Sequence, residues 1–225
     1  FDIFAHTSFG RHTLLFIDLE AIGGNGPADY LATFSPLNDD AGSTQNADGL
    51  DQLHLLEAWA EFSVFKQAVT ITAGKIDLTN YFDNNASAND ETSQFISSAF
   101  VNSAALPVPG NSPGVRFRTT VLDRFFVQFG IASIDNAGND LFDDLFKIAG
   151  FGFRVFPNSD WEANLRFYGY QHPLAGEARG YGLSYDEAIA GTFNVFARYN
   201  KNETGLAQWF GIESAWSFGA RFVQT

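Results

Sequence analysis

Apolar and polar residues alternate with a period of two through most of the chain. In the stretch GVRFRTTVL, Val115 and Phe117 share one phase, whereas Arg116 and Arg118 share the other. This is the pattern of a β-strand with one apolar face, because successive side chains of a strand point to opposite faces. The pattern predicts an all-β chain of about twelve strands. They are expected near residues 2–9, 12–22, 52–66, 68–77, 114–122, 125–134, 147–156, 161–171, 178–189, 191–200, 207–214 and 216–224.

The connections between these strands alternate between tight turns and long loops. Short turns on one rim and long loops on the other are typical of an outer-membrane barrel. Many of the expected strands also reach about the 9–11 residues that a tilted strand needs to cross a bilayer. We therefore predict an antiparallel transmembrane β-barrel of the outer-membrane type. Tight turns are expected at residues 10–11, 66–67, 123–124, 157–160, 190–191 and near Ala215, and the longest loops at 23–51 and 78–113.

The same alternation predicts that the chain is one part of a larger barrel. If the tight turns are periplasmic, the first strand runs inward from the outside and the twelfth strand ends outside. Bacterial single-chain barrels normally have an even number of strands, with both ends in the periplasm. At least one strand is then expected before Phe1 and one after Thr225. We predict a single β-barrel domain over residues 1–225, incomplete at both ends, from a barrel of roughly 14 or more strands.

The composition argues against several classes of protein. A net charge of −13 disfavours nucleic acid as a partner, because phosphate binding requires clustered Lys and Arg. No stretch of the sequence approaches the roughly 18 consecutive apolar residues of a transmembrane helix. The chain has no Cys, and its four His residues lack the spacing of metal ligands. Motifs of nucleotide binding or nucleophilic hydrolysis are also missing, so no enzyme, cofactor or metal site is predicted.

Charged side chains fall on the polar phase of the expected strands. A cation facing lipid at the middle of the bilayer would cost about 2–4 kcal/mol, so the polar phase is expected to face a wet interior. Opposed basic and acidic walls would select and orient dipolar solutes. The alternative is that these charges neutralise one another and fill the barrel. The candidate pore-lining residues are Arg116, Arg118, Arg154, Arg166, Arg198, Arg221, Asp18, Glu20, Glu57, Glu61 and Trp59.

Aromatic residues occur on both phases and suggest two uses. On the polar phase, Trp59, Tyr168 and Phe196 are expected to offer flat surfaces to sugar rings. On the apolar phase, aromatic residues near strand ends fit an interfacial girdle in contact with membrane lipid. The girdle candidates are Phe9, Phe125, Trp161, Tyr199 and Trp216.

The loop from Leu78 to Pro113 is too long and too apolar in its second half to be merely solvated. Folded into the barrel, it would narrow the channel, bury apolar residues against the wall and present carboxylates to the pore. The alternative is an external loop packed on its neighbours or on another subunit. The constriction candidates are Tyr81, Asp83, Asp90, Glu91 and Phe95, with Ile96, Phe100 and Val101 expected to be buried beside Phe95.

The phrases GKIDLTNYFD, NDETSQF and AFVN, followed by NSPGVR, NLRFYGY and AWSFGA, resemble the carbohydrate-selective porin family of the OprB type. The resemblance covers most of the chain and is strongest over residues 54–118. It implies a barrel of about 16 strands in a Gram-negative-type outer membrane, sometimes packed as an oligomer. It also implies a pore narrowed by an inward loop and lined by Arg and Glu, here Arg116, Arg118, Glu57 and Glu61.

The first functional hypothesis is therefore an outer-membrane porin that passes carbohydrates and other small hydrophilic solutes by diffusion through a charged, loop-narrowed channel. A second hypothesis is a plugged structural barrel that anchors or scaffolds surface partners. A third is a soluble β-sandwich that binds glycans. The sequence leaves open the solute, the ion selectivity, and whether a homo-oligomer or a surface complex forms.

Overall fold

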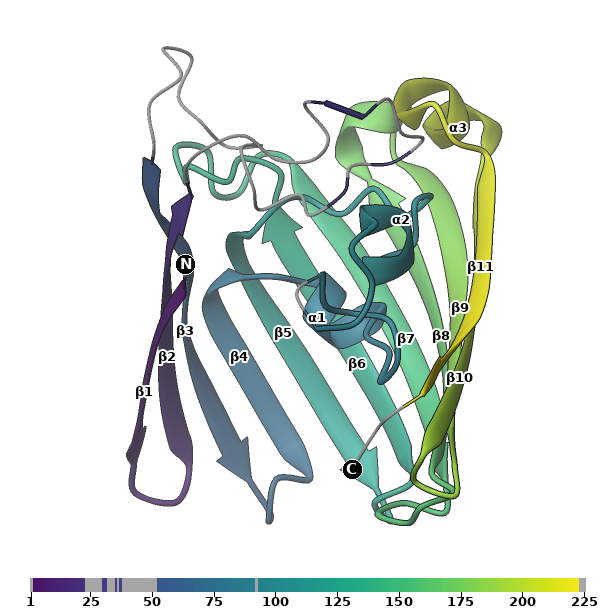
Figure 1. The fold of residues 1–225 in the computed structure, drawn as a ribbon. Helices are drawn as coiled ribbons and strands as arrows, with labels where there is room; N and C mark the ends of the chain where they lie inside the picture. The colour runs from purple at the N-terminus through teal and green to yellow at the C-terminus, as the bar shows by residue number, and fades with distance from the viewer. Residues whose placement is uncertain are drawn as a thin grey trace.

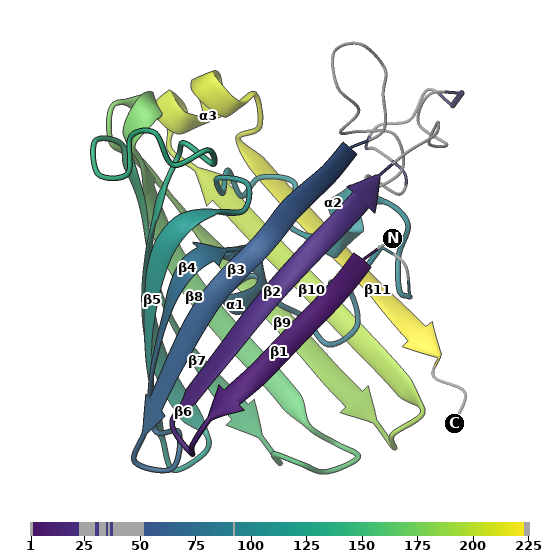
Figure 2. The same cartoon turned by 90° about the vertical axis from the view of Figure 1, so that its left-hand side faces the viewer.

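A computed structural model describes residues 2–22, 30, 31, 35, 37, 52–91 and 93–222. Eleven strands form one antiparallel sheet, in which every strand pairs with its neighbours in the sequence (Figures 1 and 2). The described sheet is strongly curved, and its concave side is called the hollow here; β1 and β11 are the two edges of the sheet. The strands are β1 (Asp2–Phe9), β2 (Thr13–Ile22), β3 (Gln52–Val64), β4 (Val69–Ile76), β5 (Ser112–Val121), β6 (Phe125–Ser133), β7 (Leu145–Val155), β8 (Ala163–His172), β9 (Ala178–Ile189), β10 (Phe193–Asn202) and β11 (Ser214–Phe222).

The described connections contain four short helical segments. They are α1 (Thr79–Phe82), α2 (Ser98–Val101), the 3₁₀ turn η2 (Pro173–Ala175) and α3 (Thr204–Phe210). Helices α1 and α2 lie inside the curve of the sheet, whereas α3 lies at the rim that carries the longer connections (Figure 1). Among the described residues, no helix combines the length and apolar character that crossing a membrane would require.

The tight turns share one rim of the sheet, at the bottom of Figure 1. Residues in the left-handed region of backbone conformation allow these turns to be short. In the β3–β4 turn, φ is positive, between 52° and 68°, at Phe65, Lys66 and Gln67. At the β1–β2 turn, Gly10 takes φ 66° without the steric cost that a Cβ would bring. The predicted loop 23–51 falls largely outside the described residues.

The eleventh of the predicted strands is wrong. Residues 207–214, expected as a strand, include most of helix α3, which ends where Gly211 takes φ 88° and donates its N–H to the carbonyl of Ala207. Leu206 of this helix is fully buried. The other predicted strands agree with the observed ones within about two residues. Consequently the predicted tight turn near Ala215 is absent from the described structure, and β11 runs toward the tight-turn rim, not away from it.

The sheet separates apolar and polar side chains as the alternation predicts. Along β6, Phe125, Val127, Phe129 and Ile131 are exposed on the convex face, whereas Gln128 is buried on the concave face. One irregularity occurs where the pairing of β2 and β3 shifts between Asp18 and Leu19. The hydrophobic core lies inside the curve, where the segment between β4 and β5 packs on the inner faces of β6, β7 and β8.

Candidate functional site

The connection between β4 and β5, residues 77–111, is called the inserted segment here. It enters the hollow and carries both α1 and α2 (Figure 1). Its apolar anchor consists of Leu78 and Phe82, each with 1% of its surface exposed. Glycines of the wall make room for this anchor: a Cβ built at Gly130 would lie 2.9 Å from Cε2 of Phe82, and one at Gly150 would lie 3.3 Å from its Cδ1. The wall is therefore shaped to receive α1.

Asp83 is the polar centre of the contact between segment and wall. Tyr168 of β8 donates its hydroxyl to Oδ1 at 2.7 Å, and the backbone N–H of Ser103 donates to Oδ2 at 2.7 Å. Nε of Arg198 on β10 lies 3.4 Å from Oδ1. The expectation that Asp83 presents its carboxylate to the pore is wrong, because this side chain is fully buried against the wall.

Arg198 binds the inserted segment through backbone as well as carboxylate. Its Nη1 donates to the carbonyl of Phe100 at 2.7 Å, and its Nη2 donates to the carbonyls of Asp83, at 2.9 Å, and Ala88. One buried guanidinium thus ties together three parts of the segment that are up to 17 residues apart, a use that suits its fixed fork of donors.

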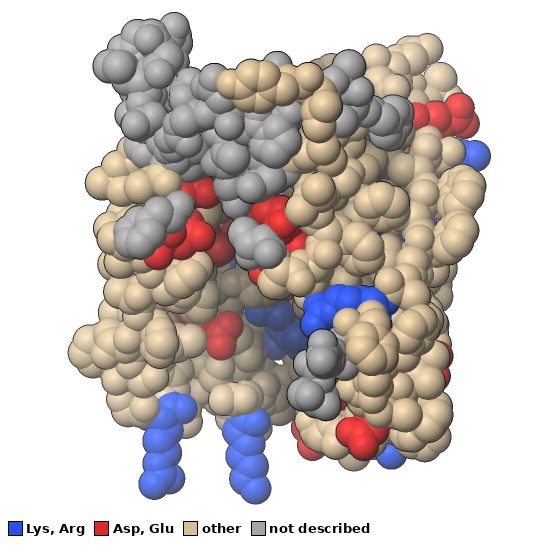
Figure 3. All heavy atoms as spheres, viewed as in Figure 1, with Lys and Arg blue, Asp and Glu red and all other residues tan. Residues whose placement is uncertain are grey.

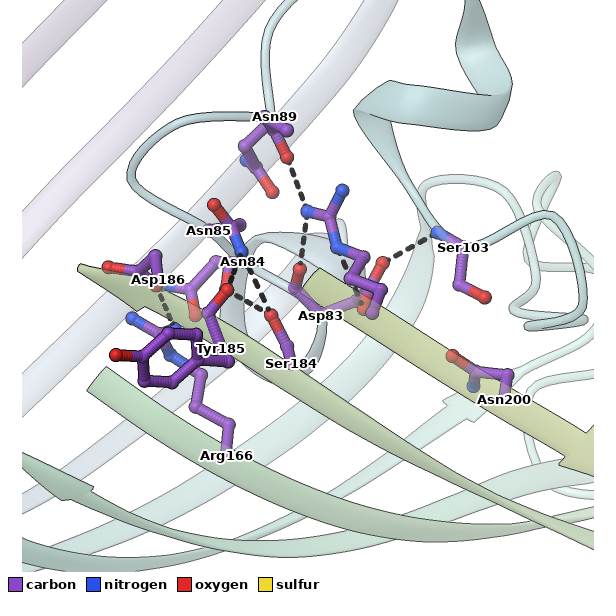
Figure 4. A network of polar contacts seen from close by, with 12 residues as sticks. Asp83, Asn84, Asn85, Asn89, Ser103, Arg166, Ser184, Tyr185, Asp186 and Asn200 are labelled. Carbon is purple, nitrogen blue, oxygen red and sulfur yellow. Dashed lines mark hydrogen bonds and ion pairs between the residues drawn. The ribbon is translucent and has the colours of Figure 1, made fainter. Parts of the chain in front are cut away.

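Further contacts from the wall satisfy the segment's polar groups. Asn85 donates its amide to the hydroxyl of Ser184 at 3.2 Å and to the carbonyl of Tyr185 at 3.0 Å (Figure 4). The hydroxyl of Tyr170 and the amide of Asn202 both donate to the carbonyl of Ala105, at 3.2 and 2.9 Å. These contacts hold the segment against β8, β9 and β10.

Near the start of the segment, α1 meets the basic part of the wall. The guanidinium of Arg116 lies over the ring of Tyr81 at 4.2 Å, and Gln128 donates to the carbonyl of Tyr81 at 2.6 Å. Burial raises the pKa of Tyr81 above its ordinary value, so its hydroxyl is neutral at physiological pH. Burial also raises the pKa of Asp77, although Thr79 donates two hydrogen bonds to its Oδ1.

The second half of the segment packs less completely than predicted. Phe95 contacts Phe100 and Phe196, with ring centroids 5.5 and 5.4 Å apart, and Val101 is buried. Ile96 and Phe100 are exposed, by 60% and 37%, so their predicted burial is wrong. Asp90 and Glu91 are half-buried, and Asp90 accepts the N–H of Ser93 at 2.6 Å.

All six predicted arginines lie on the concave phase of their strands, but they have different surroundings. Arg166 pairs with Asp186, as Arg198 does with Asp83, while Arg116 lies 4.0 Å from Glu61. Arg118 and Arg154 line a polar cavity of about 440 Å³ at the tight-turn end of the hollow, together with Arg116. Arg221 is half-buried on β11, near the edge of the sheet.

The acidic wall lies on β2 and β3, where Asp18 pairs in register with Glu57. Asp18, Glu20 and Glu57 are buried, and Trp59 donates its indole N–H to Glu57 at 3.1 Å. Figure 3 shows a group of acidic side chains in the upper half of this face, below the long-loop rim, and basic side chains deeper in the hollow. Among the described residues, unpaired basic groups are therefore concentrated toward the tight turns, while ion pairs such as Arg198–Asp83 and Arg166–Asp186 bring the two kinds of charge together elsewhere in the interior.

Of the three predicted sugar platforms, two are closed off. Tyr168 and Phe196 are buried under the inserted segment, so the expectation that they offer open surfaces to sugar rings is wrong. Trp59 is half-buried and stacks on Phe16, with ring centroids 4.9 Å apart. Within the described ranges, no group of three or more His, Asp or Glu residues is arranged to hold a metal ion.

Several residues of this site were not predicted from the sequence. All of them lie on the polar phase of strands. Gln128, Ser184 and Asn202 bind the segment through neutral side chains. Asn200 accepts the hydroxyl of Tyr168, and Asp186 pairs with Arg166. Their position on the concave phase could have identified them as interior residues. Nothing local shows which groups they bind, because the partners named here lie between 20 and 99 residues away.

Comparison with known proteins agrees with this architecture. The family described as "Carbohydrate-selective porin, OprB family" matches residues 17–209. The chain belongs to this family. The resemblance predicted from the sequence is thus confirmed, and the family is one of transport channels, not of enzymes.

Two individual proteins are similar to this porin. An uncharacterized protein of Aquifex aeolicus (strain VF5) is 30% identical over 159 residues, which are 71% of this chain and 47% of that protein. The porin chain therefore spans about half the length of this relative. The high-pH structure of Pseudomonas putida OprB matches with a TM-score of 0.58 and 14% identity, covering 90% of this chain and 59% of that chain. This second likeness concerns the fold, and it confirms the predicted antiparallel barrel of the outer-membrane type.

Proposed function

We propose that this porin lets carbohydrates and other small hydrophilic solutes diffuse passively through a water-filled channel in the outer membrane of a Gram-negative-type envelope. Membership of the OprB family supports transport through the barrel. The observation that carries the proposal is the division of the sheet into an apolar convex face and a charged concave face, onto which one segment is folded.

The convex face suits contact with lipid. Exposed large apolar side chains cover it, including Phe129 on β6, Phe151 on β7 and Phe218 on β11. In water, the exposure of so many aromatic side chains on one face would cost free energy. In a bilayer the same side chains contact the apolar lipid chains. If the convex face contacts lipid, the concave face lines the channel.

On the concave face, the inserted segment narrows the channel. It is fixed to β8–β10 by Asp83 and Arg198, and it leaves the polar cavity beside Arg118 and Arg154 open. Solutes would be filtered by size at the segment and by charge along the wall, with no covalent step and no cofactor.

Liposome swelling with sugars of graded size tests this function. The full-length protein is reconstituted, and swelling rates are measured with a monosaccharide, a disaccharide and a trisaccharide, with protein-free liposomes as the control. We expect uptake that falls with increasing size, because the segment narrows the channel. Absence of uptake of even the monosaccharide would contradict the proposal and favour a plugged barrel that scaffolds surface partners.

A further inference from the structure

We propose that the cavity formed by Arg116, Arg118 and Arg154 binds the anionic group of a solute, namely a carboxylate or phosphate carried by a sugar. This inference rests on the proposed function and names a class of substrate for it. The cavity, called the basic cavity here, lies at the tight-turn end of the hollow. Its remaining lining comes from Glu61, Ser63, Lys66, Gln67, Ala68, Thr70, Thr120, Asp123 and Asn158.

The balance of charge in the basic cavity is the opposite of that of the whole chain. Four cations, Arg116, Arg118, Arg154 and Lys66, face two carboxylates, Glu61 and Asp123. The chain as a whole has a net charge of −13. A local excess of cations in a protein of this composition attracts anions to one place.

Two of these arginines lack the partner that the other buried arginines have. Among the residues that the structure describes, no carboxylate lies within 4.0 Å of a nitrogen of Arg118 or Arg154. Arg118 instead lies over the ring of Phe126 at 4.3 Å and donates to the hydroxyl of Thr120 at 3.3 Å. A guanidinium has five donors, so most donors of this pair have no acceptor among the described residues.

Like charges near Arg118 raise the cost of leaving the basic cavity empty. The positive charges of Arg116, Arg154 and Arg166 repel the positive charge of Arg118. A bound carboxylate or phosphate would offset this repulsion and accept paired hydrogen bonds from a guanidinium, a geometry that neutral hydroxyls do not match.

The rest of the lining suits the sugar part of such a solute. Ser63, Thr70 and Thr120 contribute hydroxyl groups, and Asn158 contributes a side-chain amide. Ser63 and Thr70 lie with their hydroxyl oxygens 3.4 Å apart, on adjacent strands. The volume of about 440 Å³ falls in the range of roughly 300–1,000 Å³ that is typical of small-molecule sites.

Isothermal titration of the full-length protein in detergent micelles tests the inference. The probes are glucuronate, glucose 6-phosphate, glucose and inorganic phosphate. We expect both charged sugars to bind at least about tenfold more tightly than glucose. If inorganic phosphate binds as tightly as glucose 6-phosphate, the result supports recognition of the anionic group by the arginines and contradicts a contribution of the sugar part. Equal affinity for glucose and both charged sugars would overturn the inference.

Variants distinguish binding by the arginines of the basic cavity from a general effect of the protein's positive charges. The double variant Arg118→Gln/Arg154→Gln is expected to lose at least about tenfold in affinity for glucuronate, and Arg118→Lys/Arg154→Lys to retain part of it. The matched control, Lys147→Gln/Lys201→Gln, removes two cations from exposed positions outside the hollow and should change the affinity less than about twofold. Equal losses in the test and control variants would overturn the inference.

Liposome swelling distinguishes failure of the site from failure of the proposed function. Charged-sugar binding without any uptake of sugars would contradict the porin function while supporting the basic cavity. Normal uptake of glucose without preferential binding of charged sugars would overturn the basic cavity and leave the porin function standing.

Discussion

Replacing Asp83 by alanine is expected to release the inserted segment from the wall. The side chains of Asp83 and Arg198 are 0% and 1% exposed, so the substitution leaves an uncompensated guanidinium in the interior. Removing one partner of such a buried pair costs roughly 3–5 kcal/mol. Since about 1.4 kcal/mol corresponds to a factor of ten, the undocked population should rise by about two to three and a half orders of magnitude.

Amide hydrogen exchange of the inserted segment in the folded, reconstituted protein measures this change. Protection of the Ser103 amide should fall with that of its neighbours, because its N–H donates to Asp83. The matched control is Glu177→Ala, which breaks an exposed pair with Lys147 at 3.6 Å and should cost less than about 1 kcal/mol. Exchange in Asp83→Ala that remains within about threefold of the unmodified protein would refute the reasoning.

A double-mutant cycle tests whether the loss comes from the unpaired charge. Asp83→Ala and Arg198→Met are each expected to weaken docking. Together they should weaken it by less than the sum of the two losses, because the double variant leaves no isolated charge. Additive losses would mean that the two side chains act independently, contrary to the 3.4 Å contact.

Three further predictions concern other parts of the site. Gly130→Ala should weaken docking by about 1–3 kcal/mol, measured by exchange, because its Cβ would press on the buried ring of α1. Tyr81→Ala should speed liposome swelling with a disaccharide, because it removes a ring from the narrowed channel and the contact with Arg116. The N–H of Ala137, helped by other amides of its loop, lowers the pKa of Asp135; carboxyl titration by NMR should show this. Loop order is then expected to be complete above the ordinary pKa of aspartate and to be lost as pH falls through the lowered value.

Each of these has a control in the same chain. Gly169→Ala is a neutral match for Gly130→Ala, since the nearest atom to its Cβ is 3.7 Å away. Tyr181→Ala removes an exposed tyrosine outside the channel and should leave swelling unchanged. Asp135→Asn should abolish the pH dependence of its loop, and a dependence that persists would contradict the assignment to this carboxyl.

The sequence predicted the sheet well because strand alternation is a local property. Arg116 and Arg118 alternate with Val115 and Phe117 along β5, so the pleat sends the charged and the apolar side chains to opposite faces. Helix α3 was missed for a related reason: a short apolar run such as AQWFG has too few residues for its period to separate strand from helix. In the helix, Leu206 is fully buried, a tertiary contact that the local sequence pattern does not show.

Long-range contacts decided the role of the inserted segment. Its apolar content alone indicated that it packs on something, but Asp83 was expected to face the pore, whereas the fold places it beside Arg198 and Tyr168. The sequence by itself determined which side chains share a face, since a period of two follows from backbone geometry. Only the tertiary structure decided which of these charges are paired and which remain open. The fold brings together side chains as many as 115 residues apart, such as those of Asp83 and Arg198, and pairing depends on that proximity.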